Sequence, residues 1–353
     1  MLQQTRAEVV IPYFLRWMAL FPDLQSLAQA SEARVMKAWE GLGYYSRTRR
    51  LHQGARFILD RWGAVPREEK DLLSIPGIGP YTAAAIRSFA FQERGVAVDG
   101  NVARVVARCL GWKEQSRAEI HKRAYSYIDE HLPRDASQHP WELVEASIEL
   151  GACICKPKGA LCEQCPLREV CVAFRTQQVE NILPPKKNQI QPVDRFVPLL
   201  VSQGGEQEHV LLFHHPPWSL MGGLYEFPSI PLAERSQWEK LASTRGVYPV
   251  SEVSFAPITH CYTRFRATLH AALFTVEQTR PVPPSISLGE VLFNSSGEDK
   301  PRKRLASRPS LAWHRRSQLA DYSFSSGHRK ILFLLRSKIW TGMRFKASHA
   351  VSK

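Results

Sequence analysis

Five of the seven cysteines lie in one short stretch of the chain, between Cys153 and Cys171. In a reducing compartment, such a cluster indicates metal ligation rather than disulfide bonds. Four of the five follow the pattern C-x6-C-x2-C-x5-C, namely Cys155, Cys162, Cys165 and Cys171. One loop can in this way place four thiolates around a [4Fe–4S] cluster, each ligating one iron. A structural zinc site is the alternative, although four-cysteine zinc sites usually show two C-x2-C pairs.

A pair of glycines in "LLSIPGIGPYTAAAIRSFAF" indicates a tight turn between two helices. We expect the helices over residues 67–73 and 80–91, with Gly77 and Gly79 bracketing the turn at positive φ. Such a hairpin can direct backbone N–H groups and a helix N-terminus at a DNA phosphate. It can equally be an ordinary corner between two helices, which also needs glycine.

An aspartate and an asparagine precede the next amphipathic helix, in "VAVDGNVARVVARC". Asp99 and Asn101 can form the N-cap and turn of a helix whose apolar face includes Val102 and Val106. Alternatively, Asp99 can be a carboxylate held over an active site. The two interpretations are compatible because a capping position fixes a side chain rigidly.

The charge of the chain indicates a polyanionic partner. The 353 residues carry a formal net charge of +14, and the pI is near 9.6. Nucleic acid is the partner that best fits this charge, and a basic surface kept for solubility is the alternative. No apolar run approaches the ~18 residues of a membrane helix, and the first residues do not form a signal segment. We therefore expect no membrane association and a cytoplasmic protein, associated with the nucleoid if the source is bacterial.

The spacing of apolar residues divides the chain into two domains. Helical periodicity begins in "MLQQTRAEVVIPYF" and continues into the cysteine loop, so we expect an all-α domain followed by an α+β domain. The all-α domain spans 1–175 and includes the cysteine loop at 153–171. A polar linker, rich in Pro and Lys, occupies 176–194. The second domain spans 195–340, and a tail follows at 341–353.

Strand and helix patterns alternate in the second domain. Two strands joined by a Gly-Gly turn are expected in "RFVPLLVSQGGEQEHVLLFHH", and a further strand in "ATLHAALFTVEQ". The basic stretch "SSGEDKPRKRLASRPS" is expected to be an exposed loop. A closing helix is expected in "SSGHRKILFLLRSKIW".

These features, in this order along the chain, resemble the helix-hairpin-helix DNA glycosylase superfamily. Within it, the segments "MLQQTRAEVVIPYF", "WEGLGYYSRTRRLH", "IPGIGPYTAAAI", "VDGNVARVVAR" and "ELGACIC" resemble adenine DNA glycosylases of the MutY type. The resemblance covers residues 1–175, and "WSLMGGLYEFP" and "WHRRSQLADYSFSSGHRKIL" extend it into the second domain. It implies a glycosylase domain with a [4Fe–4S] loop, followed by a Nudix-like α/β domain.

The resemblance implies a monofunctional glycosylase of base excision repair. Its reaction is hydrolysis of the N-glycosidic bond of an adenine mispaired with 8-oxoguanine or guanine. The endonuclease III branch has a catalytic lysine at the position of Tyr81, and that lysine forms a Schiff base with the sugar. A phenol cannot form an imine, so an endonuclease III-like pyrimidine glycosylase-lyase is the less favoured interpretation.

The resemblance also implies roles for individual residues. Asp99 would stabilise the cationic sugar that remains when adenine leaves, and Asn101 would support the site. Tyr81 would pack beside the sugar, and Glu145 would contact the edge of the flipped adenine. The residues expected to contact DNA are Gln4 and Tyr44, which enter the duplex, Gly77 and Gly79 of the hairpin, and Lys156 and Lys158 of the cysteine loop. The alternatives for these side chains are packing or solvated surface positions.

The family's general acid is a glutamate two residues before the methionine of "MLQQT", and this methionine is Met1 here. We therefore expect that glutamate upstream of the sequence. We also expect little or no turnover by the chain as written, since loss of a general acid typically costs ~10²–10⁴-fold. A catalytically impaired mispair-binding protein is the alternative function. The expected partner is double-stranded DNA containing A:8-oxoguanine or A:G mispairs, bound by a monomer.

The second domain resembles the Nudix-like module that reads 8-oxoguanine in these enzymes. A Nudix hydrolase needs a glutamate-rich helix to hold metal ions, and "PLAERSQWEKLASTRG" does not supply one. The lesion-reading loop of relatives ends in Phe-Ser-His, where this sequence has Tyr262, Thr263 and Arg264. Thr263 keeps a hydroxyl group, whereas Arg264 offers hydrogen-bond donors without an acceptor.

Overall fold

The fold was analysed in a computed structural model of the chain. The structure describes residues 1–338 apart from several gaps. The gaps are residues 4, 114–115, 184–189, 204–207, 218, 220, 237, 239–248, 263–264 and 278–309.

The described residues form two compact units, which are treated separately below. One unit combines Met1–His52 with Gln189–Lys353, and the other is Gln53–Asn188. The first 52 residues group with the C-terminal part because they hydrogen-bond to its loops, for example from Lys37 to the carbonyl oxygen of Tyr322 at 2.6 Å. The boundaries expected from the sequence divide the chain by composition and periodicity, whereas these two units are defined by their contacts in space. The expected boundaries therefore stay predictions.

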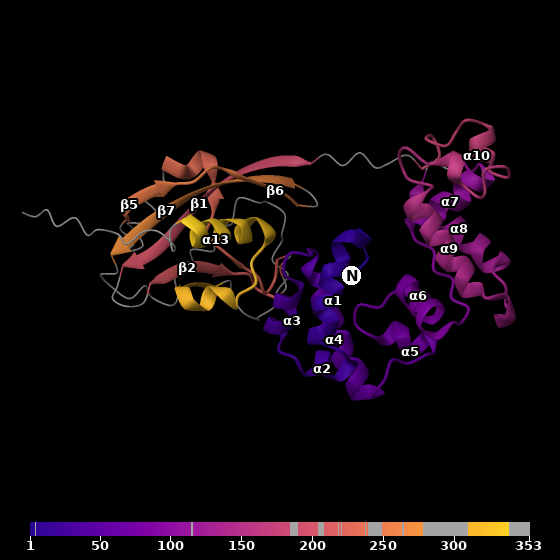
Figure 1. Ribbon diagram of the computed structural model, residues 1–353, viewed down its shortest axis with the longest axis horizontal. Coiled ribbons are helices and arrows are strands. Elements are labelled where there is room, and N and C mark those ends of the chain that lie inside the picture. Colours follow the sequence, from indigo (N-terminus) through magenta and orange to yellow (C-terminus); the bar gives the residue numbers. More distant parts are fainter. Residues whose placement is uncertain are drawn as a thin grey trace, which may run out of the picture. The chain divides into compact units, whose positions relative to one another are not determined.

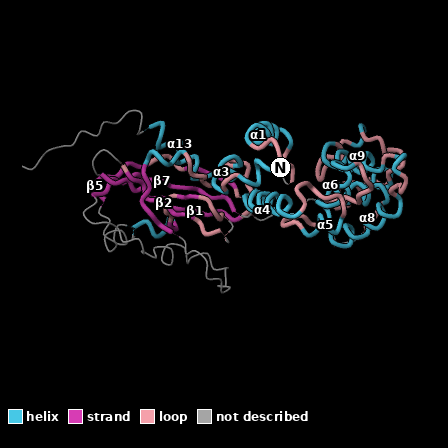
Figure 2. Tube along the Cα trace, turned by 90° about the horizontal axis from the view of Figure 1, so that it is seen from below, coloured by secondary structure: helices cyan, strands magenta, loops and turns pink. Residues whose placement is uncertain are grey.

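The unit Gln53–Asn188 is helical (Figures 1 and 2). Its helices are the end of α4 (Tyr45–Arg61), α5 (Glu69–Ser74), α6 (Pro80–Phe91), α7 (Gly100–Leu110), α8 (Arg117–His131), α9 (Pro140–Cys153) and α10 (Val172–Arg175). Helix α7 supplies much of the core, because Val102, Ala103 and Val106 on it are buried against the neighbouring helices. The helices expected on either side of the glycine hairpin are confirmed as α5 and α6.

Part of the expected linker belongs to the core of this helical unit. Ile182 is buried, and Val179 and Leu183 pack beside it against the same cluster. The carbonyl oxygen of Ile182 also accepts a hydrogen bond from the buried Arg108, at 3.3 Å. The polar composition of the stretch conceals these apolar residues, so its first residues continue the helical unit instead of leaving it.

The other unit contains the N-terminal helices α1 (Ala7–Leu20), α2 (Leu24–Gln29) and α3 (Glu32–Trp39). Helix α1 confirms the periodicity of the first residues, but within this unit only part of its apolar face is covered. Trp17 is buried and packs edge-on against Trp39, with 5.5 Å between the ring centroids. Val9 and Phe14, which the periodicity assigns to the same face, are exposed.

A mixed sheet forms the rest of that unit (Figure 1). The strands are β1 (Gln191–Gln203), β2 (His209–His214), β3 (Tyr225–Glu226), β4 (Ile230–Pro231), β5 (Pro249–Ser254), β6 (Ile258–Cys261), β7 (Phe265–Glu277) and β8 (Ser310–Arg315). The main order is β3-β2-β1-β7-β5, with β4 on β1, β6 on β7 and β8 on β2. Strands β1 and β7 pair in parallel along their whole length, whereas β1 and β2 are antiparallel.

Helix α13 (Ser326–Lys338) packs on the sheet through Ile331, Leu332 and Leu335, and together they enclose the core of this domain. The expected fold class is therefore confirmed: a helical part is followed by an α/β part. The strand expected in "ATLHAALFTVEQ" is β7, and the expected closing helix is α13. The expected Gly-Gly turn and basic loop lie outside the described residues. Within the described part of the chain, the helices are all too short or too polar to cross a membrane.

Candidate functional site

Asp99 is fixed at the N-terminus of α7 by three hydrogen bonds. Its Oδ1 accepts from the backbone N–H groups of Asn101 and Val102, both at 2.8 Å. Its Oδ2 accepts from the side-chain amide of Asn101 at 2.9 Å. The sequence therefore predicted the N-cap correctly, and the cap holds the carboxylate in a single orientation beside the positive end of the helix dipole.

A buried arginine extends this arrangement away from the carboxylate. One terminal nitrogen of Arg104 donates to Asn101 Oδ1 at 2.9 Å and to the carbonyl oxygen of Gly151 at 2.7 Å. Its Nε donates to the carbonyl oxygen of Cys155 at 2.8 Å. The guanidinium group thus connects the Asp99–Asn101 pair to the end of α9 and to the first cysteine of the loop.

The end of α9 approaches α7 closely at Gly151. A Cβ atom at this position would lie 2.7 Å from the Cβ atom of Asn101 and 2.9 Å from its carbonyl carbon. Only glycine permits this approach without a shift of one helix. Glu145 lies on the same helix, two turns earlier, and its side chain is exposed. The structure gives no contact between Glu145 and Asp99, so the adenine contact of Glu145 stays a prediction.

Tyr81 and Asp99 lie close enough to interact electrostatically. Tyr81 is the second residue of α6, and burial together with the Asp99 carboxylate raises the pKa of its hydroxyl group. The phenol therefore stays protonated near neutral pH and cannot act as a charged nucleophile. The position that a lysine takes in glycosylase-lyases is thus occupied by a neutral hydroxyl group beside the carboxylate.

The glycine hairpin agrees with the sequence at one glycine and differs at the other. Gly77 has φ +90°, in the region that favours glycine. Gly79 is the N-cap of α6 with φ −105° and ψ 179°, so the positive φ expected there is wrong. Gly79 instead provides an extended entry into α6, whose second position holds Tyr81. The hairpin thus positions Tyr81 as well as the backbone that is expected to meet DNA.

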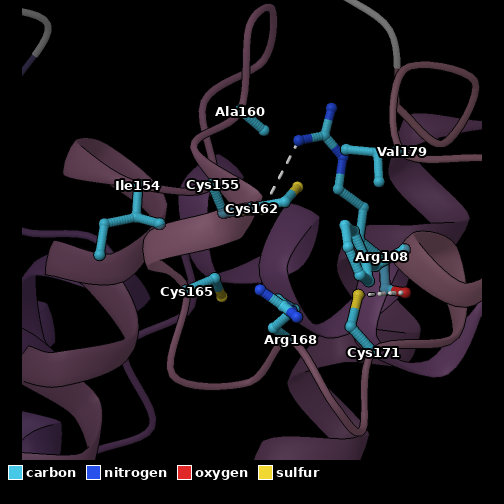
Figure 3. Close-up of a pocket in the computed structure, with 10 residues that line it drawn as sticks. Arg108, Ile154, Cys155, Ala160, Cys162, Cys165, Arg168, Cys171 and Val179 are labelled. Carbon is cyan, nitrogen blue, oxygen red and sulfur yellow. Dashed lines mark hydrogen bonds between the residues drawn. The ribbon is translucent and has the colours of Figure 1, made fainter.

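The four cysteines of the pattern line a single cavity (Figure 3). They are Cys155, Cys162, Cys165 and Cys171. Burial raises the pKa of Cys162, and the other three thiols raise it further, which shows that they share one environment. Cys153 lies outside the cavity lining and is exposed, as its place outside the pattern predicts.

Arg108 forms part of the wall of this cavity and holds its loop in place. It is 1% exposed and donates to the carbonyl oxygen of Lys156 at 2.7 Å and to the Cys155 sulfur at 3.5 Å. The thiol of Cys171 donates to the carbonyl oxygen of Arg108 at 3.5 Å. Four thiols from one loop beside a buried cation fit a cofactor that takes four thiolate ligands and carries negative charge. Among the described residues, no three His, Cys, Asp or Glu side chains converge closely enough to hold a single metal ion, whereas a four-iron cluster takes one thiolate on each of its irons.

The residues expected to contact DNA are placed in part. Tyr44 is 39% exposed and has φ +52°, and Arg47 lies over its ring at 4.9 Å from the centroid. Lys158 is exposed at the tip of the cysteine loop, whereas Lys156 is half-buried. Gln4 lies outside the described residues. These positions do not test whether the residues contact DNA, so the expected DNA contacts stay predictions.

The residues expected to read the lesion are described only at Tyr262, because Thr263 and Arg264 lie outside the described residues. Tyr262 is half-buried, and its ring stacks on Phe265 with 4.5 Å between centroids. Burial and the nearby Glu226 carboxylate raise the pKa of the Tyr262 hydroxyl group. Tyr262 therefore anchors the turn between β6 and β7 from inside the domain.

Sequence reasoning missed three residues that build the site, namely Arg104, Arg108 and Gly151. The two arginines lie one helical turn apart in "VARVVAR", on the buried face of a strongly amphipathic helix. A charged residue on the apolar face of a helix is a signal for a buried partner, because burial of an unpaired charge is costly. Gly151 could have been noted as a glycine inside a helix that continues to Cys153.

Comparisons with protein families agree with this architecture. Residues 1–130 match the model of the HhH-GPD superfamily base excision DNA repair protein, and residues 199–333 match the model of the NUDIX domain. Residues 1–130 are therefore similar to the HhH-GPD superfamily of base excision DNA repair proteins, and residues 199–333 are similar to NUDIX domains.

The names of curated relatives narrow the class of DNA repair protein that the chain resembles. Adenine DNA glycosylase from Rattus norvegicus is 35% identical over 289 residues, which cover 69% of this chain and 55% of the relative. The Homo sapiens enzyme of the same name is 31% identical over 338 residues, covering 80% of this chain and 61% of the relative. The chain is thus similar to these adenine DNA glycosylases over 69–80% of its own length, and it spans 55–61% of the length of these curated relatives. Among solved structures, a thermostable thymine-DNA glycosylase is 26% identical with a TM-score of 0.43, covering 50% of this chain and 80% of that chain.

Proposed function

We propose that this protein is a monofunctional DNA glycosylase that removes adenine opposite 8-oxoguanine or guanine in double-stranded DNA. The observation that carries the proposal is the Asp99 carboxylate, fixed at the start of α7 beside the neutral hydroxyl group of Tyr81. The names of the relatives support the choice of adenine as the base.

Asp99 would act on the sugar rather than on the base. Departure of a protonated adenine leaves positive charge on the sugar ring, as in glycoside hydrolysis. The capped carboxylate is already oriented, so it stabilises this charge without reorganising. Asn101 would maintain that orientation through its amide, while Arg104 holds the Asn101 side chain from behind.

Tyr81 would keep the reaction at base release. An amine at this position could attack the sugar carbon and form an imine, from which strand cleavage follows. The Tyr81 hydroxyl group cannot form this intermediate. We therefore expect an intact abasic strand as the product.

DNA binding would use exposed residues of both compact units and the positive charge of the chain. The target base must leave the helix to reach a pocket, and an exposed aromatic side chain can take its place in the stack. Tyr44, on its strained turn, suits this role, and Lys158 suits a phosphate contact. We further propose that the protein acts as a monomer in the cytoplasm, associated with the nucleoid if the source is bacterial.

The cavity lined by Cys155, Cys162, Cys165 and Cys171 would hold a [4Fe–4S] cluster. When bound, the cluster would cross-link the ends of the loop and so fix its shape. Arg108 would complement the negative charge of the thiolates and hold the loop backbone at Lys156. The NUDIX domain would read the oxidised guanine, with the turn at Tyr262 facing the lesion.

The proposal is tested by base release under single-turnover conditions. The substrates are duplexes with adenine opposite 8-oxoguanine, guanine or thymine. The assay uses the 353-residue chain and the same chain preceded by the segment that lies upstream of the matching region in the rat relative, so that the result does not depend on where the chain begins. We expect the extended chain to release adenine from the first two duplexes, and we expect neither chain to cross-link to DNA on borohydride reduction. Release of a pyrimidine, or a borohydride-trapped complex, would contradict the proposal.

A further inference from the structure

Residues 322–329, which end in the first turn of α13, contact two other parts of the same compact unit, namely the turn after α3 and Tyr262. We call these residues the bridging segment. On one side, this bridging segment is bound by the residues that follow α3. Glu40 is buried, and its Oε1 accepts a hydrogen bond from the backbone N–H of Phe324 at 2.8 Å. Its Oε2 forms an ion pair with Lys37 at 2.9 Å, and Lys37 donates to the carbonyl oxygen of Tyr322 at 2.6 Å.

The turn after Glu40 is bound to the same segment. The Tyr45 hydroxyl group accepts from the backbone N–H of Gly41 at 3.0 Å and donates to the carbonyl oxygen of Phe324 at 3.5 Å. Burial and the Glu40 carboxylate raise the pKa of Tyr45, so the hydroxyl group keeps the proton that it donates. Arg329 donates to the carbonyl oxygen of Glu40 at 3.1 Å.

The backbone of this turn is strained, and the turn presents Tyr44 as an exposed side chain. Gly41, Gly43 and Tyr44 all have positive φ, at 98°, 79° and 52°. Positive φ at a tyrosine is costly and persists only where the surroundings impose it. The Trp39 indole N–H donates to the carbonyl oxygen of Gly43 at 2.9 Å, and the contacts of Glu40 and Tyr45 fix the two ends. The bridging segment is therefore part of what holds Tyr44 in its exposed conformation.

The other side of the bridging segment touches the turn between β6 and β7. A Cβ atom at Gly327 would lie 3.0 Å from the Tyr262 hydroxyl oxygen and 2.9 Å from a methyl carbon of Leu269. Tyr262 closes the turn through a hydrogen bond from its backbone N–H to the carbonyl oxygen of Phe265 at 2.8 Å. One short segment thus contacts both the turn that presents Tyr44 and the side chain of Tyr262, which directly precedes Thr263 and Arg264 in the sequence.

We propose that Glu40 is a positioning residue that, through the bridging segment, sets the place of Tyr44 relative to the Tyr262 turn. This inference rests on the proposed function, in which Tyr44 enters the duplex and the Tyr262 turn reads the oxidised base. Because the two turns must meet the same mispair, a small displacement of one relative to the other weakens recognition of the lesion. Loss of the Glu40 contacts therefore lowers discrimination between lesions more than it lowers DNA binding in general.

The test compares Glu40→Ala with Glu40→Gln and with the control Glu130→Ala. The alanine variant removes both contacts of the carboxylate, whereas glutamine keeps an acceptor for the Phe324 N–H and loses only the charge opposite Lys37. Glu130 is an exposed glutamate of α8, in the other compact unit. For each chain, affinity is measured for duplexes with adenine opposite 8-oxoguanine and opposite guanine, and amide hydrogen exchange is measured at residues 322–329.

We expect Glu40→Ala to lose exchange protection at the bridging segment and to lower the ratio of the two affinities by about fivefold or more. Its affinity for the guanine duplex stays close to that of the unaltered chain. Glu40→Gln falls between the alanine variant and the control. If Glu40→Ala does not fold, Glu40→Gln and Lys37→Met decide the question, because Lys37 is one-third exposed and its replacement removes the ion pair with Glu40 and the hydrogen bond to Tyr322.

Two results separate the inference from the function on which it rests. Lost exchange protection with an unchanged affinity ratio, or an equal loss of affinity for both duplexes, overturns the coupling alone. Equal affinity of the unaltered chain for both duplexes overturns the proposed recognition of 8-oxoguanine, and the coupling with it.

Discussion

Replacement of Arg104 by methionine tests how much the hydrogen bonds of this buried guanidinium group stabilise the fold around Asp99 and the cysteine loop. Methionine keeps the apolar stem of the side chain and removes the guanidinium group. Arg104 is 7% exposed and donates four hydrogen bonds, to Asn101 Oδ1 and to the carbonyl oxygens of Gly100, Gly151 and Cys155. The variant therefore leaves four acceptors without their donor.

The expected loss of stability follows from the four lost hydrogen bonds and from the cost of burying the guanidinium charge. A hydrogen bond to a charged group contributes about 1.5–3 kcal/mol. Burial lowers the pKa of Arg104, which shows that part of this gain is offset by desolvation. We therefore expect a loss of about 3–5 kcal/mol in the free energy of unfolding, the range observed when one partner of a buried charge network is removed. Arg104→Lys keeps the charge but not the planar fork, and its loss should be smaller.

The assay is urea denaturation of the three chains and of a control, Arg56→Met, which changes an exposed arginine of α4. The control should change the free energy of unfolding by less than ~0.5 kcal/mol. A similarly small change in Arg104→Met would refute the argument, because it would show that the four acceptors find other donors without cost.

Three further predictions concern packing, pH and the cofactor. Gly151→Ala should destabilise the protein by ~1–3 kcal/mol in urea denaturation, because its Cβ overlaps Asn101, whereas Gly100→Ala, with no atom near its Cβ, should not. Burial lowers the pKa of His328 below its ordinary 6.5, so stability should fall as the pH drops below that value, where the unfolded chain binds a proton that the folded chain does not. His328→Asn should reduce this fall between about pH 7.5 and about pH 5.5, and an unchanged slope would contradict the assignment. Cys165→Ser should lower the iron content measured by elemental analysis, and an equal loss in the exposed control Cys153→Ser would contradict the ligand set.

Local features of the site could be predicted from the sequence because they depend on short spacings. The cap at Asp99 and the turn at Gly77 follow from residue types whose backbone preferences are strong. The convergence of the cysteines on one cavity follows from a loop too short to place them elsewhere. Gly79 differed from the prediction because a glycine can serve as an extended helix cap as readily as in a left-handed turn.

The contacts between distant segments could not be predicted in this way. Glu40 and Phe324 are 284 positions apart, and no periodicity links them. Tyr262 was assigned to lesion reading from the resemblance of its segment to the lesion-reading loop of relatives, and its half-buried position depends on how α13 packs on the sheet. Two of the partners of Arg104, Gly151 and Cys155, likewise lie some fifty positions further along the chain, and only the fold brings them to α7.

The most direct test of the proposed function is adenine release by Asp99→Asn, introduced into the extended chain of the assay described above. Asparagine is a good helix cap of the same shape, so the variant keeps the fold and removes only the negative charge. We expect the rate of adenine release to fall by ~10²–10³-fold, while Asp135→Asn, which changes a capping aspartate at the exposed turn Ala136–Gln138, leaves the rate unchanged. An Asp99→Asn variant that releases adenine as fast as the unaltered chain would contradict the account.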